Sequence, residues 1–403
     1  MSLGHACVDV YQGAVAALVP FFVSERAYTY AAASGLVLAA SLLSSVVQPL
    51  FGALTDKWPM PWLLPASALL GGVGVALSGV GGSYALTLAV VAVSGIGVAA
   101  YHPEAARVAR LASRGSHTAM GWFSLGGNLG FATAPLLVAA VIATGGLGAT
   151  PLLVVPALAG AALCAAALRA LRAPSERTAS GVREAADVTE TASRTETASS
   201  DDWASFARLS GAVVCRSIVF VGLSTFLSLY APQRAGGGEV SGTAALFVLY
   251  LGGAVGTVVG GKLATRHQRV TVVRWSYALT VLAVAGVVLV PGPLLFLFVA
   301  LTSAGLYVPF SLHVTLGQDY LPRRVGTAGG VTLGLTVSIG GLASPVVGAV
   351  ADATSLQTAL APLIALPALG WLLLRTLREP EVPTLSAPPA TNPGGRRPAR
   401  RTA

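Results

Sequence analysis

The sequence predicts an all-α integral membrane protein, with twelve transmembrane helices arranged as two six-helix bundles. Three observations lead to this fold class. Only 10% of the 403 residues are charged and 54% are hydrophobic, whereas about a quarter of the residues in an ordinary soluble domain are charged. The apolar residues gather in long stretches, and the two halves of the chain repeat one another. The composition excludes a soluble globular protein and, for most of the chain, a disordered one.

The apolar stretches each have close to the roughly 17 to 25 residues that a transmembrane helix needs. The strands of a membrane β-barrel would be about 10 residues long and would alternate in polarity. The first stretch contains His5 and Asp9 and lacks a basic leader, so we expect it to be kept rather than cleaved as a signal peptide. In chain order the stretches are 3–24, 31–53, 62–80, 83–106, 118–143, 150–171, 207–231, 241–264, 270–291, 294–318, 326–350 and 356–377.

The basic residues predict the orientation of these helices, because cytoplasmic loops collect Lys and Arg. With both termini in the cytoplasm, every one of the 25 Lys and Arg residues except Arg26, Arg216 and Arg234 lies on that side. Topology therefore accounts for the net charge of +9 without a nucleic-acid partner. The predicted location is the inner or plasma membrane. The predicted parts are an N-terminal bundle (1–171), a polar cytoplasmic linker (172–206), a C-terminal bundle (207–378) and a Pro-rich, disordered cytoplasmic tail (379–403).

An internal repeat relates the two predicted bundles. At an offset of 209 residues, Gly52 aligns with Gly261 and Lys57 with Arg266, and at an offset of 210 Pro135 aligns with Pro345. Two six-helix repeats of parallel topology place a substrate near the membrane midplane, between the halves, and open it alternately to either side by rocking.

Several motifs carry a resemblance to a known family. The loop Gly52-Ala-Leu-Thr-Asp-Lys57 resembles the signature loop of the major facilitator superfamily, although Pro59-Met-Pro-Trp62 replaces the Gly-Arg-Arg that ends it there. The chain is similar to the fosmidomycin-resistance family over nearly its whole membrane portion. The motifs that carry this second similarity are the Thr-Asp-Lys-Trp-Pro-Met-Pro-Trp loop, His5-x-x-x-Asp9, Tyr101-His-Pro-Glu-Ala-Ala-Arg107, Gly126-Gly-Asn-Leu-Gly-Phe-Ala-Thr-Ala-Pro135 and Ala351-Asp-Ala-Thr-Ser355. The resemblance implies a proton-coupled exporter of small anionic antimicrobials such as fosmidomycin. We expect a monomer without a cofactor, and the spacing of the three cysteines does not predict a metal site.

Ionisable groups at membrane depth are rare and costly, so each is a candidate functional residue. His5 and Asp9 are four residues apart and therefore share one helix face. Asp9 is the first candidate for the proton-carrying carboxylate, with His5 as its partner; the alternative is a permanent structural pair. Glu104, at the inner rim of the fourth helix, is the second candidate, and the sequence leaves open which of the two carries the proton.

Arg216 lies inside the seventh stretch, the repeat mate of the first, and could face Asp9 across a central cavity. A guanidinium there would suit a phosphonate, phosphate or carboxylate, which it binds with two parallel hydrogen bonds. The alternative is a side chain that extends along the helix towards the cytoplasm. Tyr11, Gln12 and Asn128 are the other candidates for substrate contact.

The predicted gate lies at the cytoplasmic rim. The family resemblance assigns Asp56 and Lys57 to a latch in which the loop carboxylate meets an arginine and a helix N-terminus of the other half. The alternative is that Asp56 only caps its loop. His102, Arg107 and Arg110 are further gating candidates, either as a relay or as part of an ion pair that clamps the fourth helix to the loop.

Two other functions remain open at this point. One is a facilitator or uptake carrier for an anionic metabolite, such as a sugar phosphate or an organic acid, because alternating access runs in either direction. The other is a non-transporting membrane receptor, in which Asp9 and Arg216 would be an unexplained cost. The sequence contains no nucleotide-binding loop, metal cluster or nucleophile triad, so we do not expect an enzyme.

Overall fold

The computed structural model describes residues 1–113, 117–178 and 200–380, and this part of the chain is helical without any strand. Nine helical runs within it are long and apolar enough to cross a membrane. One of them, the 53-residue run Ala119–Leu171, contains two spans, because the 3₁₀ segment η1 (Gly146–Val154) turns the chain inside it. The shorter apolar helices Leu63–Leu77 and Ser338–Ala353 complete the twelve predicted spans.

The helix bounds follow the predicted stretches closely. The first half contains α1 (Ser2–Arg26), α2 (Tyr30–Lys57), α3 (Leu63–Leu77), α4 (Tyr84–Ala112), α5 (His117–Gly145) and α6 (Val155–Thr178). The second half contains α7 (Trp203–Ala235), α8 (Gly238–Ala264), α9 (Arg269–Leu289), α10 (Leu294–Tyr307), α11 (Phe310–Tyr320), α12 (Val325–Gly329), α13 (Thr336–Ala353), α14 (Leu356–Leu360) and α15 (Ala365–Leu374).

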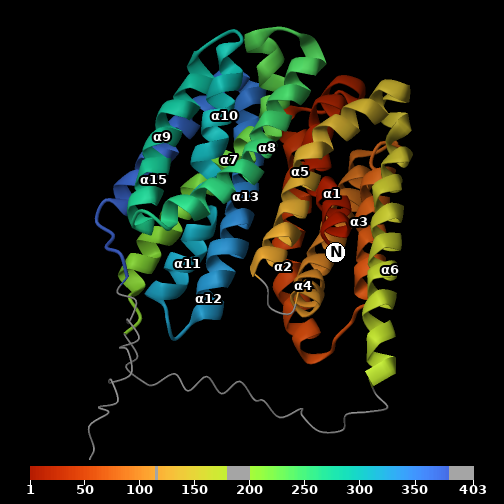
Figure 1. The fold of residues 1–403 in the computed structure, drawn as a ribbon. Helices are drawn as coiled ribbons and strands as arrows, with labels where there is room; N and C mark the ends of the chain where they lie inside the picture. The colour runs from red at the N-terminus through yellow and green to blue at the C-terminus, as the bar shows by residue number, and fades with distance from the viewer. Residues whose placement is uncertain (114–116, 179–199, 381–403) are drawn as a thin grey trace, which may run out of the picture.

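The two halves form two bundles that lie side by side, α1–α6 in red to yellow and α7–α15 in green to blue (Figure 1). Helix α6 continues to Thr178 and α7 begins at Trp203, so helix occupies both ends of the predicted linker. The rest of the linker, 179–199, and the predicted tail beyond residue 380 lie outside the described residues. We call the end of the bundles where α6 stops and α7 starts the linker end, and the opposite end the far end.

Small residues allow the helices within a bundle to approach closely. At the contact of α3 with α4, a Cβ added to Gly97 would lie 2.9 Å from the Cα of Gly71. The Ser94 hydroxyl of α4 also donates a hydrogen bond to the Gly71 carbonyl, at 2.7 Å. The high glycine content that would weaken soluble helices therefore serves close packing in this fold.

Three of the spans are discontinuous within the described residues; the twelfth consists of α14, the 3₁₀ segment η3 (Ala361–Ile364) and α15. The tenth span breaks at Val308 and Pro309 into α10 and α11, because proline lacks the N–H that would continue the helix ladder. The eleventh span consists of α12, the π-helical segment η2 (Gly330–Leu335) and α13. Broken helices at membrane depth are tolerated where they line a cavity or are buried in protein. These breaks therefore mark backbone that is shielded from lipid.

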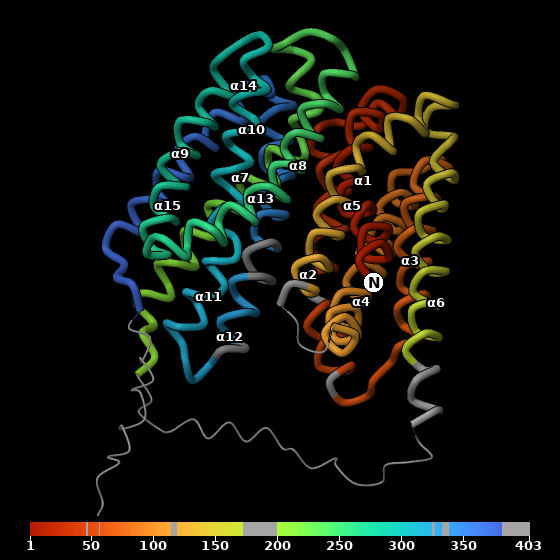
Figure 2. The backbone as a smooth tube through the Cα atoms, viewed as in Figure 1, coloured from red at the N-terminus to blue at the C-terminus, as the bar shows by residue number. Residues whose placement is uncertain are grey.

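The two bundles are joined tightly at the far end by α2 and α13. The Asp352 carboxylate of α13 accepts hydrogen bonds from the backbone N–H groups of Tyr30 and Ala31, at 2.8 and 2.9 Å, at the N-terminus of α2. A Cβ on Gly348 would lie 2.7 Å from the Tyr30 carbonyl oxygen, so the two backbones touch here. Figure 2 shows the bundles meeting at the far end and separating towards the linker end.

Candidate functional site

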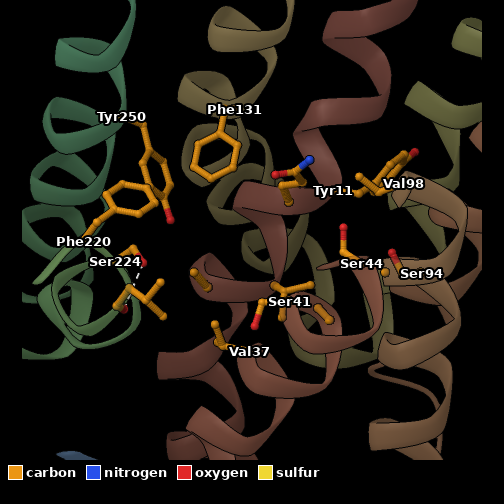
Figure 3. Close-up of a pocket in the computed structure, with 16 residues that line it drawn as sticks. Tyr11, Val37, Ser41, Ser44, Ser94, Val98, Phe131, Phe220, Ser224 and Tyr250 are labelled. Atoms are coloured by element: carbon orange, nitrogen blue, oxygen red, sulfur yellow. Dashed lines mark hydrogen bonds between the residues drawn. The ribbon is translucent and has the colours of Figure 1, made fainter. Parts of the chain in front are cut away.

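A cavity of about 710 Å³ of empty space lies between the two bundles. Helices α1, α2, α4 and α5 of the first half and α7 and α8 of the second half all contribute to its wall (Figure 3). Its position between the halves is where the repeat predicted a substrate. The lining side chains used below are Tyr11, Gln12, Ser41, Ser44, Ser94, Phe131, Phe220 and Tyr250.

One wall of the cavity is aromatic. The ring of Phe131 meets that of Tyr250 edge to face, with centroids 4.4 Å apart, and the ring of Phe220 lies 6.3 Å from that of Tyr250 (Figure 3). The buried Tyr250 hydroxyl lies beside Ser224 without a hydrogen bond of standard geometry. This hydroxyl is therefore available to a ligand, and the rings offer faces for stacking on an aromatic or apolar group.

The opposite wall carries hydroxyl groups. Ser41 and Ser94 donate their hydroxyl hydrogens to backbone carbonyls, at 3.2 and 2.7 Å, which leaves their oxygens as acceptors for a ligand. Ser44 lies next to them (Figure 3). None of the described side chains that line the cavity is charged. The cavity itself thus suits the uncharged body of a ligand.

Two of the predicted substrate contacts lie in this cavity and one lies outside its wall. Tyr11 and Gln12 are lining residues; the Tyr11 hydroxyl donates to the Leu153 carbonyl at 2.9 Å, so its ring alone faces a ligand. Asn128 is half-buried on α5, one helical turn before Phe131, and is not among the lining residues. Its role as a substrate contact stays a prediction.

Asp9 lies between two histidines in the N-terminal bundle. Its Oδ2 is 3.2 Å from Nε2 of His5, on the same helix, and its Oδ1 is 3.1 Å from Nε2 of His102, on α4. We call His5, Asp9 and His102 the His–Asp–His cluster. The sequence paired His5 with Asp9, as the structure shows, and named His102 as a member of a proton or gating relay. The structure brings His102 to the Asp9 carboxylate, and its role in gating stays a prediction.

The Nδ1 atoms of the two imidazoles, which point away from Asp9, determine where the protons of the cluster lie. Nδ1 of His5 lies 2.9 Å from the Phe123 carbonyl oxygen, and Nδ1 of His102 lies 2.7 Å from that of Val98. A carbonyl only accepts, so each Nδ1 must carry a hydrogen, and in a neutral ring each Nε2 is then a bare lone pair. A lone pair facing a carboxylate oxygen needs a proton between them. The two contacts therefore hold two protons when both are made.

The surroundings of the cluster leave it open on one side only. The side chains of His5 and Asp9 are 10% and 12% exposed, whereas that of His102 is 22% exposed. The His5 ring stacks on Phe123 at 4.2 Å and lies 6.1 Å from the Tyr101 ring. Asp9 is one turn from Gln12, so the cluster borders the central cavity. His102 is therefore the side chain through which protons would enter or leave.

The donor atoms of the cluster lie within 4.8 Å of one another, a spacing that a metal ion could also bridge. Nε2 of His5 and Oδ1 of Asp9 make no hydrogen bond of standard geometry, although they lie 3.2 and 3.1 Å from their partner atoms. With both Nδ1 atoms donating to carbonyls, the Nε2 lone pairs and the carboxylate can take up a proton or a metal ion.

Gly127 of α5 packs directly against the cluster and offers a test of its geometry. A Cβ at this position would contact Oδ2 of Asp9 and lie 2.6 Å from Cε1 of His5, both of them ends of movable side chains. We expect Gly127→Ala to displace the cluster and to slow substrate-driven proton flux about threefold, because small displacements of reacting groups are costly. The flux is measured with a pH dye inside reconstituted vesicles.

The matched control for Gly127→Ala lies on the same helix. Gly121 has nothing within 4 Å of an added Cβ, so Gly121→Ala is expected to leave the flux unchanged. Equal fluxes in the two variants would show that the packing of α5 against the cluster does not matter.

Glu104 and Arg107, at the predicted rim of α4, form an ion pair with each other within that helix. Arg107 donates from Nε to Oε2 of Glu104 at 2.8 Å and from Nη2 to Oε1 of the same side chain. Glu104 is completely buried and both of its oxygens accept hydrogen bonds from Arg107, so in this state it makes no contact with His102.

Arg110 and Lys57 are exposed near helix ends, and the side chain of Asp56 lies outside the described part of the chain. The roles of Glu104 in proton coupling and of Asp56, Lys57, Arg107 and Arg110 in gating stay predictions.

Arg216 does not point towards Asp9 as the repeat suggested. Its Nη1 donates to the Leu306 carbonyl at 3.0 Å, and its guanidinium lies 5.3 Å from the centre of the Phe310 ring. Both partners belong to the broken tenth span, where the end of α10 offers an acceptor inside the C-terminal bundle. Leu306 lies near the middle of the run Leu294–Tyr320, so the guanidinium also does not extend to the cytoplasmic surface.

The sequence was compared with known families and proteins. A sequence model of the Major Facilitator Superfamily matches residues 1–345. The chain is 30% identical to the fosmidomycin resistance protein of Escherichia coli (strain K12) over 384 residues, which cover 93% of this chain and 91% of that protein. It is also 30% identical to the uncharacterized MFS-type transporter YfnC of Bacillus subtilis (strain 168) over 392 residues, covering 91% and 89% of the two chains.

Solved structures share the fold. A bacterial homolog of the human lysosomal transporter Spinster, in an inward-facing and occupied conformation, aligns with a TM-score of 0.72 at 14% identity, covering 93% of this chain and 94% of that one. The nucleoside transporter NupG aligns with a TM-score of 0.69 at 15% identity, covering 93% and 97%. At these identities the similarity concerns the fold alone.

Proposed function

The chain belongs to the Major Facilitator Superfamily, and we propose that it is a proton-coupled exporter of small anionic antimicrobials, with fosmidomycin as the first compound to test. As a member of this superfamily it is a multi-pass membrane transporter and not an enzyme. The receptor alternative gains no support from these relatives. We expect it to act as a monomer in the inner membrane, with both termini in the cytoplasm.

The observation that carries the proposal is the His–Asp–His cluster beside the central cavity. With both contacts bridged by protons, one carboxylate and two imidazoliums give the cluster one net positive charge. Loss of a proton breaks a contact and leaves a lone pair facing a carboxylate oxygen at about 3 Å. The buried cluster therefore has two discrete states, with and without the bridging proton. A carrier needs such a pair of states to couple protonation to rocking of its bundles.

Alternating access is supported by the contacts of α2 with α13. Asp352 and Gly348 join the bundles at the far end, and the arginine distribution places the linker end in the cytoplasm. In this assignment the structure is closed to the outside. Export then requires these far-end contacts to break once the cavity is loaded.

The substrate assignment rests on the relative that is named for fosmidomycin resistance. The aromatic wall and the serine oxygens of the central cavity accommodate the body of a small polar molecule, with Tyr11 and Gln12 as contacts. A carrier that takes up an anionic metabolite would use the same cavity. The two functions differ in the direction in which protons move when substrate is added.

We expect fosmidomycin, added outside vesicles that contain the purified protein and an internal pH dye, to enter and to make the interior more alkaline. Antiport exchanges each entering substrate for a leaving proton. EDTA in all buffers removes any contribution of metal ions, and vesicles without protein are the control. Acidification of the interior, or entry of fosmidomycin without a pH change, would overturn antiport. Absence of entry, together with unchanged drug tolerance of a sensitive host that expresses the protein, would overturn this substrate.

A further inference from the structure

A second group of buried polar side chains lies inside the C-terminal bundle, away from the His–Asp–His cluster. Arg216 of α7 is 7% exposed and His313 of α11 is 1% exposed. Tyr277 links the two side chains, because it lines a small cavity together with Arg216 and its ring lies 5.8 Å from that of His313. No carboxylate in the described ranges forms an ion pair with Arg216. The guanidinium is therefore a buried cation without a counter-ion.

Several polar atoms of this group also have no hydrogen-bond partner. Nη1 of Arg216 is bound to the Leu306 carbonyl, but its Nε has no hydrogen-bond partner. Both ring nitrogens of His313 are buried without a partner as well. Burying a cation or an N–H group without a partner is costly. Unsatisfied donors around an uncompensated positive charge are the arrangement that an anion would complete.

A narrow cavity of about 170 Å³ of empty space adjoins the guanidinium. Tyr277, Thr280, Leu306 and Pro367 form its walls together with Arg216. In this conformation the walls leave no room for a free water molecule. An anion can therefore enter only when the side chains around the break in the tenth span move.

This space is separate from the central cavity, and the aromatic side chains of Phe220 and Tyr307 link the walls of the two. Phe220 lines the central cavity, and its ring meets that of Tyr307 at 5.5 Å. Tyr307 is the last residue of α10 and the neighbour of Leu306, to which Arg216 is bound. Its ring packs on α8 where Gly253 has no side chain, since a Cβ there would lie 2.9 Å from the ring. Movement of Tyr307 along α8 would join the two spaces.

We propose that Arg216, assisted by His313, is an anion-binding site behind the aromatic wall of the central cavity. A guanidinium binds carboxylate, phosphate and phosphonate oxygens with two parallel hydrogen bonds, and its free Nε–H is one of the donors needed. The ligand is either the acid group of a carried substrate or a free inorganic anion. In the first case the inference rests on the proposed function and supplies the positive charge that the central cavity lacks.

The test is the thermal stability of the purified full-length protein in detergent, with chloride, inorganic phosphate or fosmidomycin titrated into a low-salt zwitterionic buffer. A ligand that binds only the folded protein raises the Tm as its concentration passes its Kd. We expect a saturable rise of several degrees for the wild type and none for Arg216→Gln. Arg234→Gln is the matched control, because Arg234 lies on the same helix and also donates to a carbonyl, that of Leu289, but at the far end.

The variants separate loss of binding from loss of folding. Because Arg216 is an uncompensated buried charge, Arg216→Gln is expected to melt at or above the wild-type temperature when none of these anions is added. Arg216→Lys keeps the charge but loses the paired hydrogen bonds, so its Tm rise should need a higher anion concentration. A rise with fosmidomycin alone identifies the acid group of a substrate as the ligand, and a rise with chloride or phosphate identifies a free anion.

The inference is overturned if no anion produces a saturable rise in the wild type, or if Arg216→Gln shows the same rise. The measurement does not depend on transport. A protein that binds anions at Arg216 but moves no protons would contradict the proposed function and leave this site in place.

Discussion

Replacing Asp9 by asparagine is expected to abolish substrate-driven proton movement in reconstituted vesicles while leaving the fold intact. Asparagine has the same shape as aspartate, and its amide hydrogens can be donated to the bare Nε2 of one histidine. The other histidine would need a proton to meet the amide oxygen. A buried imidazolium without a counter-charge is costly, so both rings stay neutral and the cluster no longer binds protons. We expect at least a tenfold loss of flux, as for removal of a proton-transfer group.

The matched control for Asp9→Asn is Asp319→Asn. Asp319 also pairs with a basic residue, Arg269 at 2.6 Å, but its side chain is 38% exposed and lies away from the cavity. This variant should keep the wild-type flux. His102→Gln removes one of the two contacts and should reduce the flux without the complete loss expected for Asp9→Asn. Wild-type flux in Asp9→Asn would remove Asp9 from its role, and Glu104 would then be the remaining carboxylate candidate.

The fold could be predicted from the sequence because the bilayer limits which backbone structures can cross it. A membrane helix must satisfy its own backbone hydrogen bonds, so its length is set by bilayer thickness and can be read from apolar runs. The stretch 294–318 correctly predicted one span, but not its break at Pro309. Proline inside an apolar run is compatible with a straight, a bent or a broken helix, and only the packing around Arg216 and Tyr307 distinguishes these.

The candidate site could be predicted only where partners share a helix. His5 and Asp9 are four residues apart, and helix geometry places them together. Nothing in the spacing relates Asp9 to His102, whose contact depends on how α1 packs on α4. The direction of Arg216 failed for a different reason. Four serines of its helix, Ser210, Ser217, Ser224 and Ser228, lie on one face, which includes the cavity-lining Ser224, and Arg216 lies about 100° away from that face. The internal repeat relates whole helices and does not show which face a residue occupies.

Asp352 is the residue whose importance the sequence showed least. It appeared only as part of the motif Ala351-Asp-Ala-Thr-Ser355, without an assigned role. Its carboxylate caps the N-terminus of α2 from the other bundle, where two free backbone N–H groups and the positive end of the helix attract a negative charge. The contact is therefore an electrostatic latch between the halves at the far end, opposite the predicted latch at Asp56.

Removing this latch with Asp352→Ala is expected to open the far end about tenfold more often. The variant loses both hydrogen bonds to α2 and the charge, and charge-assisted hydrogen bonds are worth roughly 1.5–3 kcal/mol when buried and less at an exposed position such as this one. A loss of about 1.4 kcal/mol shifts a two-state equilibrium tenfold. Asp352→Asn keeps one acceptor oxygen but loses the charge, so its effect should be intermediate.

The opening is measured as the rate at which a membrane-impermeant maleimide, added from the far side, labels a single cysteine at Ser44 in the central cavity. The background carries serine in place of Cys7, Cys164 and Cys215, which are the free cysteines of the chain. Glu239→Gln is the control, since Glu239 is an exposed acid in the first turn of α8 at the same end. Because only the latch variants break a contact between bundles, they alone should label faster. Labelling of Asp352→Ala at the wild-type rate would show that the glycine contacts of α13 with α2 hold the far end closed without the carboxylate.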